Sequence, residues 1–421
     1  MQPSLVFADI FDNLERCKAR FERREPIVQA FLPEEGRFER LEREARDLLG
    51  RFPNPEARPP LFGALVGVKD IIHVDGFATR AGSCLPPDVL AGPEAECVSA
   101  LKSAGALILG KTVTTEFAYF APGPTRNPHN PEHTPGGSSS GSAAAVAAGT
   151  CDLALGTQTI GSIVRPAAFC GVVGWKPSYA RVSRKGVIPL APALDHVGLF
   201  ASTVSAVQLV SPVIFIDWRE LDVPRGKPVL GVPEGSYLEQ ASPEGLAHFR
   251  AVCQSLARCG YDVRQIPAMP DFAEIRARHE LLLAFEASCI HAAWFAEYAS
   301  AYSPQTAELI RRGQAVTPSE LARARLGRAR LREELAALLA GEGVDLWISP
   351  SAPGPAPRGL TSTGDPVMNL PWTQAGMPSL NLPAGVNESG LPLGLQVTGR
   401  WYADEALLAW AGDLEKALEE V

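Results

Sequence analysis

The sequence predicts an α/β fold, a large mixed β-sheet core sandwiched by helices, with an inserted helical region. Short apolar runs of strand length, first at 65–68 and then at 106–110, alternate with helical patterns, as expected of an α/β sheet. Two further strand-like runs, 345–350 and 393–399, follow a long helical stretch. The core is therefore expected to be discontinuous in the sequence.

The chain is expected to be a single domain, residues 1–421, built from four segments. At about 150 residues per domain, its length fits either two or three domains or one large enzyme domain. The strands that return after the helical stretch favour one domain. Its segments are an N-terminal helical segment (1–58), a core (59–215), a variable, mostly helical region (216–344) and a C-terminal return to the core sheet (345–421).

The individual elements follow from local patterns. Apolar positions among many Glu and Arg residues indicate two amphipathic N-terminal helices, broken between Pro26 and Pro33. A Gly/Ser turn at 136–142 opens into an Ala-rich helix at 143–148, which Gly149 closes. The apolar run 153–156 then predicts a buried strand, and the polar loop 157–166 lies at its far end.

Composition indicates a globular, acidic protein. With 46% hydrophobic and 20% charged residues, the chain can bury a substantial core. Its net charge of −8 provides no global basic field to attract polyphosphate, so we expect no nucleic-acid partner. No basic and apolar leader opens the sequence and no run of about 18 apolar residues appears, so we expect no membrane association.

Eight cysteines lie at wide spacings without a CxxC pair. They are typical of reduced, mostly buried thiols, which predicts a cytoplasmic protein. A homodimer is left open.

Three features are candidates for chemistry. The loop 136–142 precedes a helix and fits either a phosphate cradle, which lacks its usual lysine here, or a simple serine cap. The loop 157–162 ends in Gly161 and Ser162 and can present a hydroxyl beside converging amides, although most such loops are plain turns. Lys69 ends an apolar run, where a lysine is usually solvated, but burial among hydroxyls would make it a base.

Histidine and metal chemistry are not favoured. A G-x-S-x-G match at 137–141 lacks the strand that should lead into it. His129 and His133 lie among prolines that prevent the helix needed by a zinc site of this spacing. We expect no metal and no organic cofactor.

Taken together, the three features resemble the amidase signature family of serine hydrolases. The motifs that carry the resemblance are Gly-Gly-Ser-Ser-Ser-Gly-Ser (136–142), Thr-Gln-Thr-Ile-Gly-Ser (157–162), Ala-Ala-Phe-Cys-Gly (167–171), Asn-Leu-Pro (369–371) and Gly-Leu-Pro-Leu-Gly-Leu-Gln (390–396). The resemblance covers roughly 60–205 and 345–410 and implies the amidase signature fold. It implies a catalytic triad of Ser162 as nucleophile, Ser138 as bridging serine and Lys69 as base, with a cis bond between Gly137 and Ser138.

The activity implied by the resemblance is hydrolysis of a carboxylic or ureido amide to an acid and ammonia or an amine, through an acyl-enzyme. The oxyanion would be held by the backbone amides of Thr159, Ile160, Gly161 and Ser162. The partner is then a small-molecule amide substrate.

Aromatic residues indicate where an acyl group would bind. Tyr119, Phe120 and Trp372 occupy positions at which family members often line the acyl pocket, and they are equally compatible with the core. An aromatic or apolar acyl group would fit them.

Three positions depart from the family pattern. Gln158 stands where Asp is usual, Val164 where Arg is usual and Ile160 where glycine or a small residue is usual. Because the usual Asp and the usual Arg are both replaced, no buried charge is left without its partner. Arg165 lies one place farther along. This displacement predicts local rebuilding of the loop. Ile160 supplies the same backbone amide as a glycine would, but its β-branched side chain resists a positive φ.

Two other functions remain open. One is the glutaminase-type subunit of a tRNA-dependent amidotransferase, which shares the signature; the altered loop and the relatively short chain argue against it. The other is a catalytically silent binding protein of the same fold. The presence of Lys69, Ser138 and Ser162 at all three triad positions argues against it.

Overall fold

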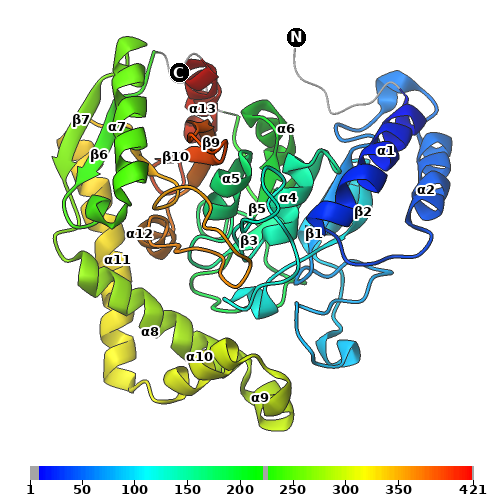
Figure 1. Ribbon diagram of the computed structural model, residues 1–421, viewed down its shortest axis with the longest axis horizontal. Coiled ribbons are helices and arrows are strands. Elements are labelled where there is room, and N and C mark those ends of the chain that lie inside the picture. The colour runs from blue at the N-terminus through cyan, green and yellow to red at the C-terminus, as the bar shows by residue number, and fades with distance from the viewer. Residues whose placement is uncertain (1–8, 221–225, 420–421) are drawn as a thin grey trace.

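The computed structural model describes residues 9–220 and 226–419, and its centre is one mixed β-sheet (Figure 1). The strand order is β2-β1-β3-β5-β4-β9-β10-β8-β6-β7. The strands are β1 (Leu65–Lys69), β2 (Leu107–Thr112), β3 (Leu153–Gln158), β4 (Val173–Lys176), β5 (His196–Ala201), β6 (Leu230–Glu234), β7 (Val263–Pro267), β8 (Leu346–Pro350), β9 (Ser379–Val386) and β10 (Pro392–Thr398). The large mixed sheet and its discontinuous core are as predicted from the sequence.

Parallel pairs lie at both ends of the sheet. β1 pairs in parallel with β2 and β3, and β6 pairs in parallel with β7 and β8. The strands between them, from β3 through β5, β4, β9 and β10 to β8, pair antiparallel. Parallel neighbours end at the same edge, so the C-terminal ends of β1 and β3 lie side by side.

Helices cover both faces of the sheet, as predicted. In β3, Leu153 and Leu155 join the core that contains α3 and α6, whereas Ala154 packs in the core that contains α4, because strand side chains alternate between faces. The helices are α1 (Ile10–Val28), α2 (Arg37–Arg51), α3 (Glu96–Ser103), α4 (Ser140–Ala147), α5 (Val164–Cys170), α6 (Val204–Ile214), α7 (Pro243–Arg258), α8 (Phe272–Ile290), α9 (Ala292–Tyr298), α10 (Pro304–Gln314), α11 (Pro318–Gly341), α12 (Leu370–Ala375) and α13 (Asp404–Glu419). Among the described residues, no helix is long and apolar enough to cross a membrane.

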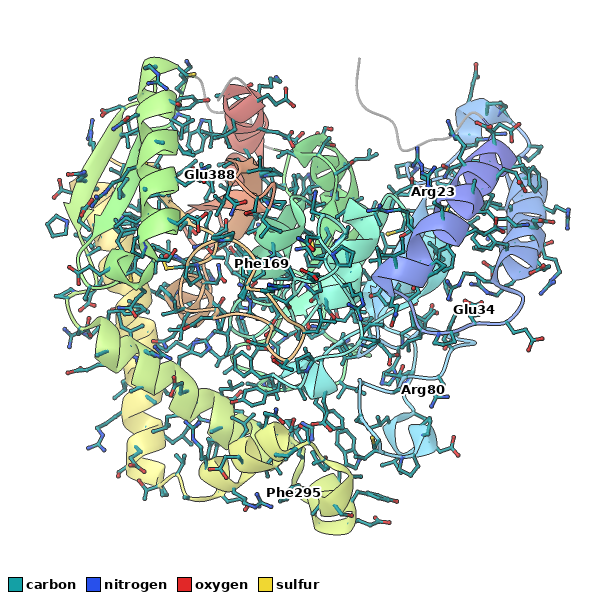
Figure 2. All side chains as sticks on the ribbon, in the orientation of Figure 1. Arg23, Glu34, Arg80, Phe169, Phe295 and Glu388 are labelled. Atoms are coloured by element: carbon teal, nitrogen blue, oxygen red, sulfur yellow. The ribbon has the colours of Figure 1, made fainter. Side chains whose placement is uncertain are left out.

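The region expected to be mostly helical also adds two strands to the sheet. β6 and β7 extend the sheet beside β8, and both escaped the sequence analysis. Gly231 and Pro233 interrupt the apolar run of β6, and β7 exposes Arg264 and Gln265, so neither strand has a clear apolar pattern. Beyond them, α8 to α11 form a helical arm, with Phe295 of α9 near its outer end and Phe169 of α5 near the centre of the molecule (Figures 1 and 2).

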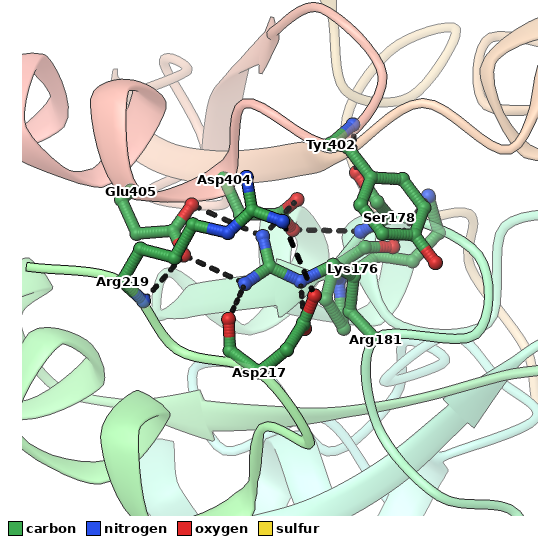
Figure 3. A network of polar contacts seen from close by, with 9 residues as sticks. Lys176, Ser178, Arg181, Asp217, Arg219, Tyr402, Asp404 and Glu405 are labelled. Atoms are coloured by element: carbon green, nitrogen blue, oxygen red, sulfur yellow. Dashed lines mark hydrogen bonds and ion pairs between the residues drawn. The ribbon is translucent and has the colours of Figure 1, made fainter. Parts of the chain in front are cut away.

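A buried ion-pair network attaches the C-terminal helix to the core (Figure 3). Arg181, which follows β4, donates from its guanidinium to Glu405 at 2.6 Å and to Asp404 at 3.3 Å, both in the first turn of α13. It also bonds Asp217 at 2.8 Å. The side chain of Arg181 is 1% exposed. The network therefore joins three segments that are far apart in the sequence.

Candidate active site

The end of β1 brings Lys69 to two hydroxyls. Thr157 lies near the end of the parallel neighbour β3, and Lys69 Nζ donates to Thr157 Oγ1 at 2.7 Å. Lys69 Nζ also lies 2.7 Å from Ser138 Oγ. Two of the three residues predicted for the triad are therefore in hydrogen-bond contact, although 69 positions separate them in the sequence.

The surroundings of Lys69 favour an uncharged amine. The side chain is fully buried, and this burial lowers the pKa of Lys69 well below its ordinary value, while Asp195 acts in the other direction with a smaller effect. The neighbouring buried lysine, Lys111, instead forms an ion pair with Asp70 at 2.9 Å. A lysine that contacts hydroxyls and no carboxylate can serve as a base.

The turn that carries Ser138 is fixed from several sides. The Gly137–Ser138 bond is cis, as expected from the resemblance. The guanidinium of Arg165 donates to Gly137 O at 2.6 Å, and Ser139 Oγ donates to Thr157 O at 3.1 Å. Burial lowers the pKa of Arg165 to about 9. The arginine that is displaced by one position from the family pattern thus supports the backbone of the bridging serine.

Ser162 lies on a loop whose amides are free. Among the described residues, no hydrogen bond uses the backbone N–H of Ile160, Gly161 or Ser162. Ile160 does not have a positive φ, so its branched side chain is compatible with the loop. A Cβ on Gly161 would lie 2.3 Å from Asn369 Oδ1, which explains the glycine. Free amides beside a hydroxyl suit an oxyanion.

Gln158 replaces the usual acid without leaving a charge. Its Oε1 accepts from the backbone N–H of Ile163 at 2.8 Å and of Val164 at 3.0 Å, and its Nε2 donates to Thr373 Oγ1 at 2.9 Å. The loop is therefore rebuilt around a neutral amide.

The three residues predicted for the triad are not all joined by hydrogen bonds. Lys69 Nζ contacts Ser138 Oγ, but in the part of the chain that the structure describes no hydrogen bond joins Ser162 Oγ to Ser138.

Ser162 borders a narrow hollow that shares lining residues with two larger cavities. The hollow, about 10 Å³, is lined by Ser162 together with Thr159, Ile160, Tyr119 and Phe120 among others. It shares Thr159 with a cavity of about 310 Å³, which is mostly apolar and includes Asp195 and His196. The hollow also shares Tyr119, Phe120 and Ile160 with a cavity of about 150 Å³. The serine is 7% exposed and accessible from this hollow.

The three aromatic residues predicted for the acyl pocket do not share one environment. Tyr119 and Phe120 are partly buried, pack against each other with ring centroids 4.8 Å apart, and line the hollow at Ser162. Trp372 is fully buried in the core, where its Nε1 donates to Tyr237 Oη at 2.9 Å. It lines neither the hollow nor the two cavities beside it.

Several residues around the loop were not found from the sequence. Asp195 accepts from Thr159 Oγ1 at 2.6 Å, His279 Nε2 lies 3.0 Å from Thr159 O, and Thr373 Oγ1 donates to Ile160 O at 2.6 Å. His279 and Thr373 lie more than a hundred residues from their partners, and no local pattern marks them. In the described part of the chain, no cluster of three or more His, Cys, Asp or Glu side chains could hold a metal ion.

Comparisons with known proteins agree on one family. The family model described as Amidase matches residues 12–408. The chain is 34% identical to the A subunit of Glutamyl-tRNA(Gln) amidotransferase from Synechococcus sp. (strain WH7803), over 95% of this chain and 92% of that protein. It is 36% identical to the protein of the same name from Thermus thermophilus, over 85% of each.

Solved structures give the same picture. A structure described as "Crystal structure of amidase" is 33% identical, with a TM-score of 0.87, and the match covers 96% of this chain and 95% of that one. Native peptide amidase from Stenotrophomonas maltophilia is 27% identical with a TM-score of 0.79, and the match covers 98% and 94% of the two chains.

These relatives correct two expectations. The prediction that nucleic acid is excluded as a partner is wrong, because relatives of this chain are named as subunits of an amidotransferase of glutamyl-tRNA(Gln). It rested on the net charge, which averages over the whole surface and says nothing of a local patch or of a contact made by another subunit. The length argument also fails, since the match covers 92% of the Synechococcus protein.

Proposed function

The chain belongs to the amidase family of amide-hydrolysing enzymes, and from that premise we propose that it cleaves a small carboxylic or ureido amide with a Ser-Ser-Lys triad. Ser162 is the nucleophile, Ser138 the proton relay and Lys69 the base. The observation that carries the proposal is the contact of 2.7 Å between Ser138 Oγ and the desolvated amine of Lys69. An uncharged amine beside a hydroxyl has the lone pair that proton transfer requires.

Acylation follows from this arrangement. As Ser162 Oγ attacks the amide carbon, its proton passes to Ser138 Oγ, and the Ser138 proton passes to Lys69 Nζ. The carbonyl oxygen becomes an oxyanion held by the free amides of Ile160, Gly161 and Ser162. When the C–N bond breaks, the relay runs in reverse and returns a proton to the departing nitrogen. Water then attacks the acyl-enzyme by the same relay and releases the acid.

The proposed substrate class comes from the cavity next to Ser162. The cavity of about 150 Å³ is lined by two arginines, Arg276 and Arg312, and by Glu280 and Asp365, so both charge signs lie within one small space. Glu280 forms ion pairs with Arg276 at 3.1 Å and with Arg312 at 3.7 Å. Such a lining suits an acyl group that bears both an amino and a carboxylate group, because each charge finds an opposite partner. This differs from the aromatic or apolar acyl group expected from the sequence.

A second candidate is the glutamine-hydrolysing subunit of a tRNA-dependent amidotransferase. The names of the curated relatives favour it over a free-standing amidase. A cavity with both charge signs also fits the α-amino and α-carboxylate groups of glutamine. In this candidate, ammonia released at Ser162 is used by a partner subunit, and contact with tRNA belongs to the assembly.

Release of ammonia or amine from a panel of amides tests the proposal. The panel contains glutamine, other amino-acid amides, aliphatic and aromatic amides, and ureido compounds. Wild type is expected to hydrolyse at least one class, and Lys69→Met to lose nearly all of that activity. Lys176→Met is the matched control, because Lys176 is also fully buried, with its pKa lowered to about 7, but bonds the carbonyl of Pro177 at 3.2 Å.

The outcomes separate the candidates. Near-normal turnover by folded Lys69→Met would overturn the triad assignment. Hydrolysis of glutamine that increases when co-purifying subunits are added supports the amidotransferase candidate, whereas partner-independent hydrolysis of other amides supports the free-standing amidase.

A further inference from the structure

Residues 159–162, which carry the proposed nucleophile, are called the nucleophile loop. Two consecutive carbonyls of this loop contact side chains from outside the core segment 59–215. Thr159 O lies 3.0 Å from His279 Nε2, which belongs to α8 of the helical arm. Ile160 O accepts from Thr373 Oγ1 at 2.6 Å, which belongs to α12. The two contacts are made to the Thr159–Ile160 and Ile160–Gly161 peptide groups, shortly before Ser162.

The position of a carbonyl fixes the direction of the next amide. In a trans peptide, the C=O of one residue and the N–H of the following residue point in opposite directions. The cis bond in the described chain is Gly137–Ser138, so the Thr159–Ile160 and Ile160–Gly161 peptides are trans. Because Thr159 O is held toward His279 of α8 and Ile160 O toward Thr373 of α12, the N–H groups of Ile160 and Gly161 point away from these contacts. Those N–H groups have no partner among the described residues.

His279 has the chemistry of a fixed donor. It is fully buried, and this burial lowers its pKa to about 3, so the ring is neutral near pH 7. A neutral imidazole carries one N–H, and because Thr159 O can only accept, that hydrogen is on Nε2. Nδ1 has no hydrogen-bond partner within the described chain, which agrees with this tautomer.

The Thr373 hydroxyl forms hydrogen bonds with two residues of the 157–162 loop, Gln158 and Ile160. Its hydroxyl accepts from Gln158 Nε2 at 2.9 Å, and Gln158 Oε1 accepts from the backbone of Ile163 and Val164. The single hydroxyl proton has two carbonyls within reach, Ile160 O at 2.6 Å and Asn369 O at 3.1 Å, and the nearer one is Ile160 O. The glutamine that replaces the usual acid thus orients the threonine.

We propose that His279 and Thr373 are positioning residues that hold the backbone amides of Ile160 and Gly161 toward the oxyanion. The inference rests on the proposed function, because it assumes that the reacting carbonyl lies at Ser162. A donor on each carbonyl also polarises the peptide and strengthens its N–H as a donor. The helical arm therefore takes part in transition-state stabilisation through His279 of α8, a side chain that does not itself contact the substrate.

Paired variants at each position test this inference. His279→Gln keeps a side-chain N–H near the place of Nε2, whereas His279→Leu removes it; Thr373→Ser keeps the hydroxyl, whereas Thr373→Val removes it in nearly the same volume. Removing a direct oxyanion donor costs about 100- to 1000-fold in kcat, and misdirecting one is expected to cost about 10- to 100-fold. The donor-free variants should lose kcat by this amount with KM within about twofold, and the donor-keeping variants should recover most of it.

Inhibitor binding gives a readout that a general structural role would not change. A boronic acid that forms a tetrahedral adduct should bind the donor-free variants more weakly in proportion to kcat, while affinity for the product acid stays constant. The inference is overturned if His279→Leu and Thr373→Val turn over at the wild-type rate, or if each donor-keeping variant loses as much kcat as its donor-free counterpart. If His279→Leu or His279→Gln fails to fold, the Thr373 pair decides.

Failure of the proposed function gives a different result. In that case, wild type forms no covalent adduct at Ser162 and hydrolyses no amide in the panel. If only the inference fails, wild type forms the adduct and turns over, and the donor-free variants do the same.

Discussion

The pKa of Lys69 links a single buried residue to the pH dependence of the enzyme. Lys69 must be uncharged to accept a proton, so activity is lost as the pH falls through its pKa. Because burial holds this pKa well below the ordinary value of 10.5, kcat/KM should rise with pH and reach its plateau well below pH 10.5. Initial rates across the pH range in which the protein stays folded measure this limb.

A limb that reaches its midpoint near 10.5 would mean that the amine is solvated, and the contacts with Thr157 and Ser138 would then not describe the working enzyme. A substrate without titrating groups in this range serves as the control, so that the limb reports the enzyme.

The sequence suggests Lys69, Ser138 and Ser162 as a triad, but it gives no sign of the residues that contact them. Glycine-serine loops and a strand-end lysine are local patterns, and their combination resembles one family. By contrast, Thr157, Arg165 and His279 act through contacts with residues far away in the sequence, so their roles depend on the fold. The expectation of a rebuilt loop agrees with the structure, in which Gln158 bonds two amides and Thr373.

Hydrogen bonds connect the helical arm, α8 to α11, to the candidate site. Glu116, in the 3-10 turn η3 (Glu116–Ala118), accepts from the backbone N–H of Ser303 at 3.0 Å, just before α10. Tyr119 and Phe120 follow this turn directly. The arm is thus bonded both to the segment that lines the hollow and, through His279, to the nucleophile loop. Variation of the arm would alter the site from two directions.

The attachment of α13 gives a stability prediction. Arg181→Met leaves Asp404 and Glu405 as buried carboxylates without their cation, and breaking a buried pair in this way typically costs about 3–5 kcal/mol. Arg219→Met is the matched control, because Arg219 is 67% exposed and lies 3.8 Å from Asp217. It should change the free energy of unfolding by less than about 0.5 kcal/mol. Urea unfolding of both variants measures the difference, and equal stabilities would contradict a structural role for the network.

Across the whole molecule, the sequence predicts the architecture well and the partners poorly. Alternating apolar runs and helical patterns predict an α/β sheet, because they depend on local periodicity, whereas the mixed sheet sandwiched by helices is what the resemblance to the family implies. Five strands, β4, β5, β6, β7 and β9, were not predicted individually. For β6 and β7 the reason is that a short strand with glycine, proline or exposed polar residues has no such periodicity. The exclusion of nucleic acid failed because net charge describes no particular surface. We propose that the segments 1–58, 59–215, 216–344 and 345–421 form one domain, since the last three share the sheet.

Covalent trapping at Ser162 shows whether this serine is the nucleophile. A fluorophosphonate is added to the folded protein, and peptide mass spectrometry locates the adduct. We expect modification of Ser162 in wild type, none in Ser162→Ala, and strongly slowed modification in Lys69→Met. An adduct on Ser138, Ser139 or another residue, or no adduct in folded wild-type protein, would contradict this assignment.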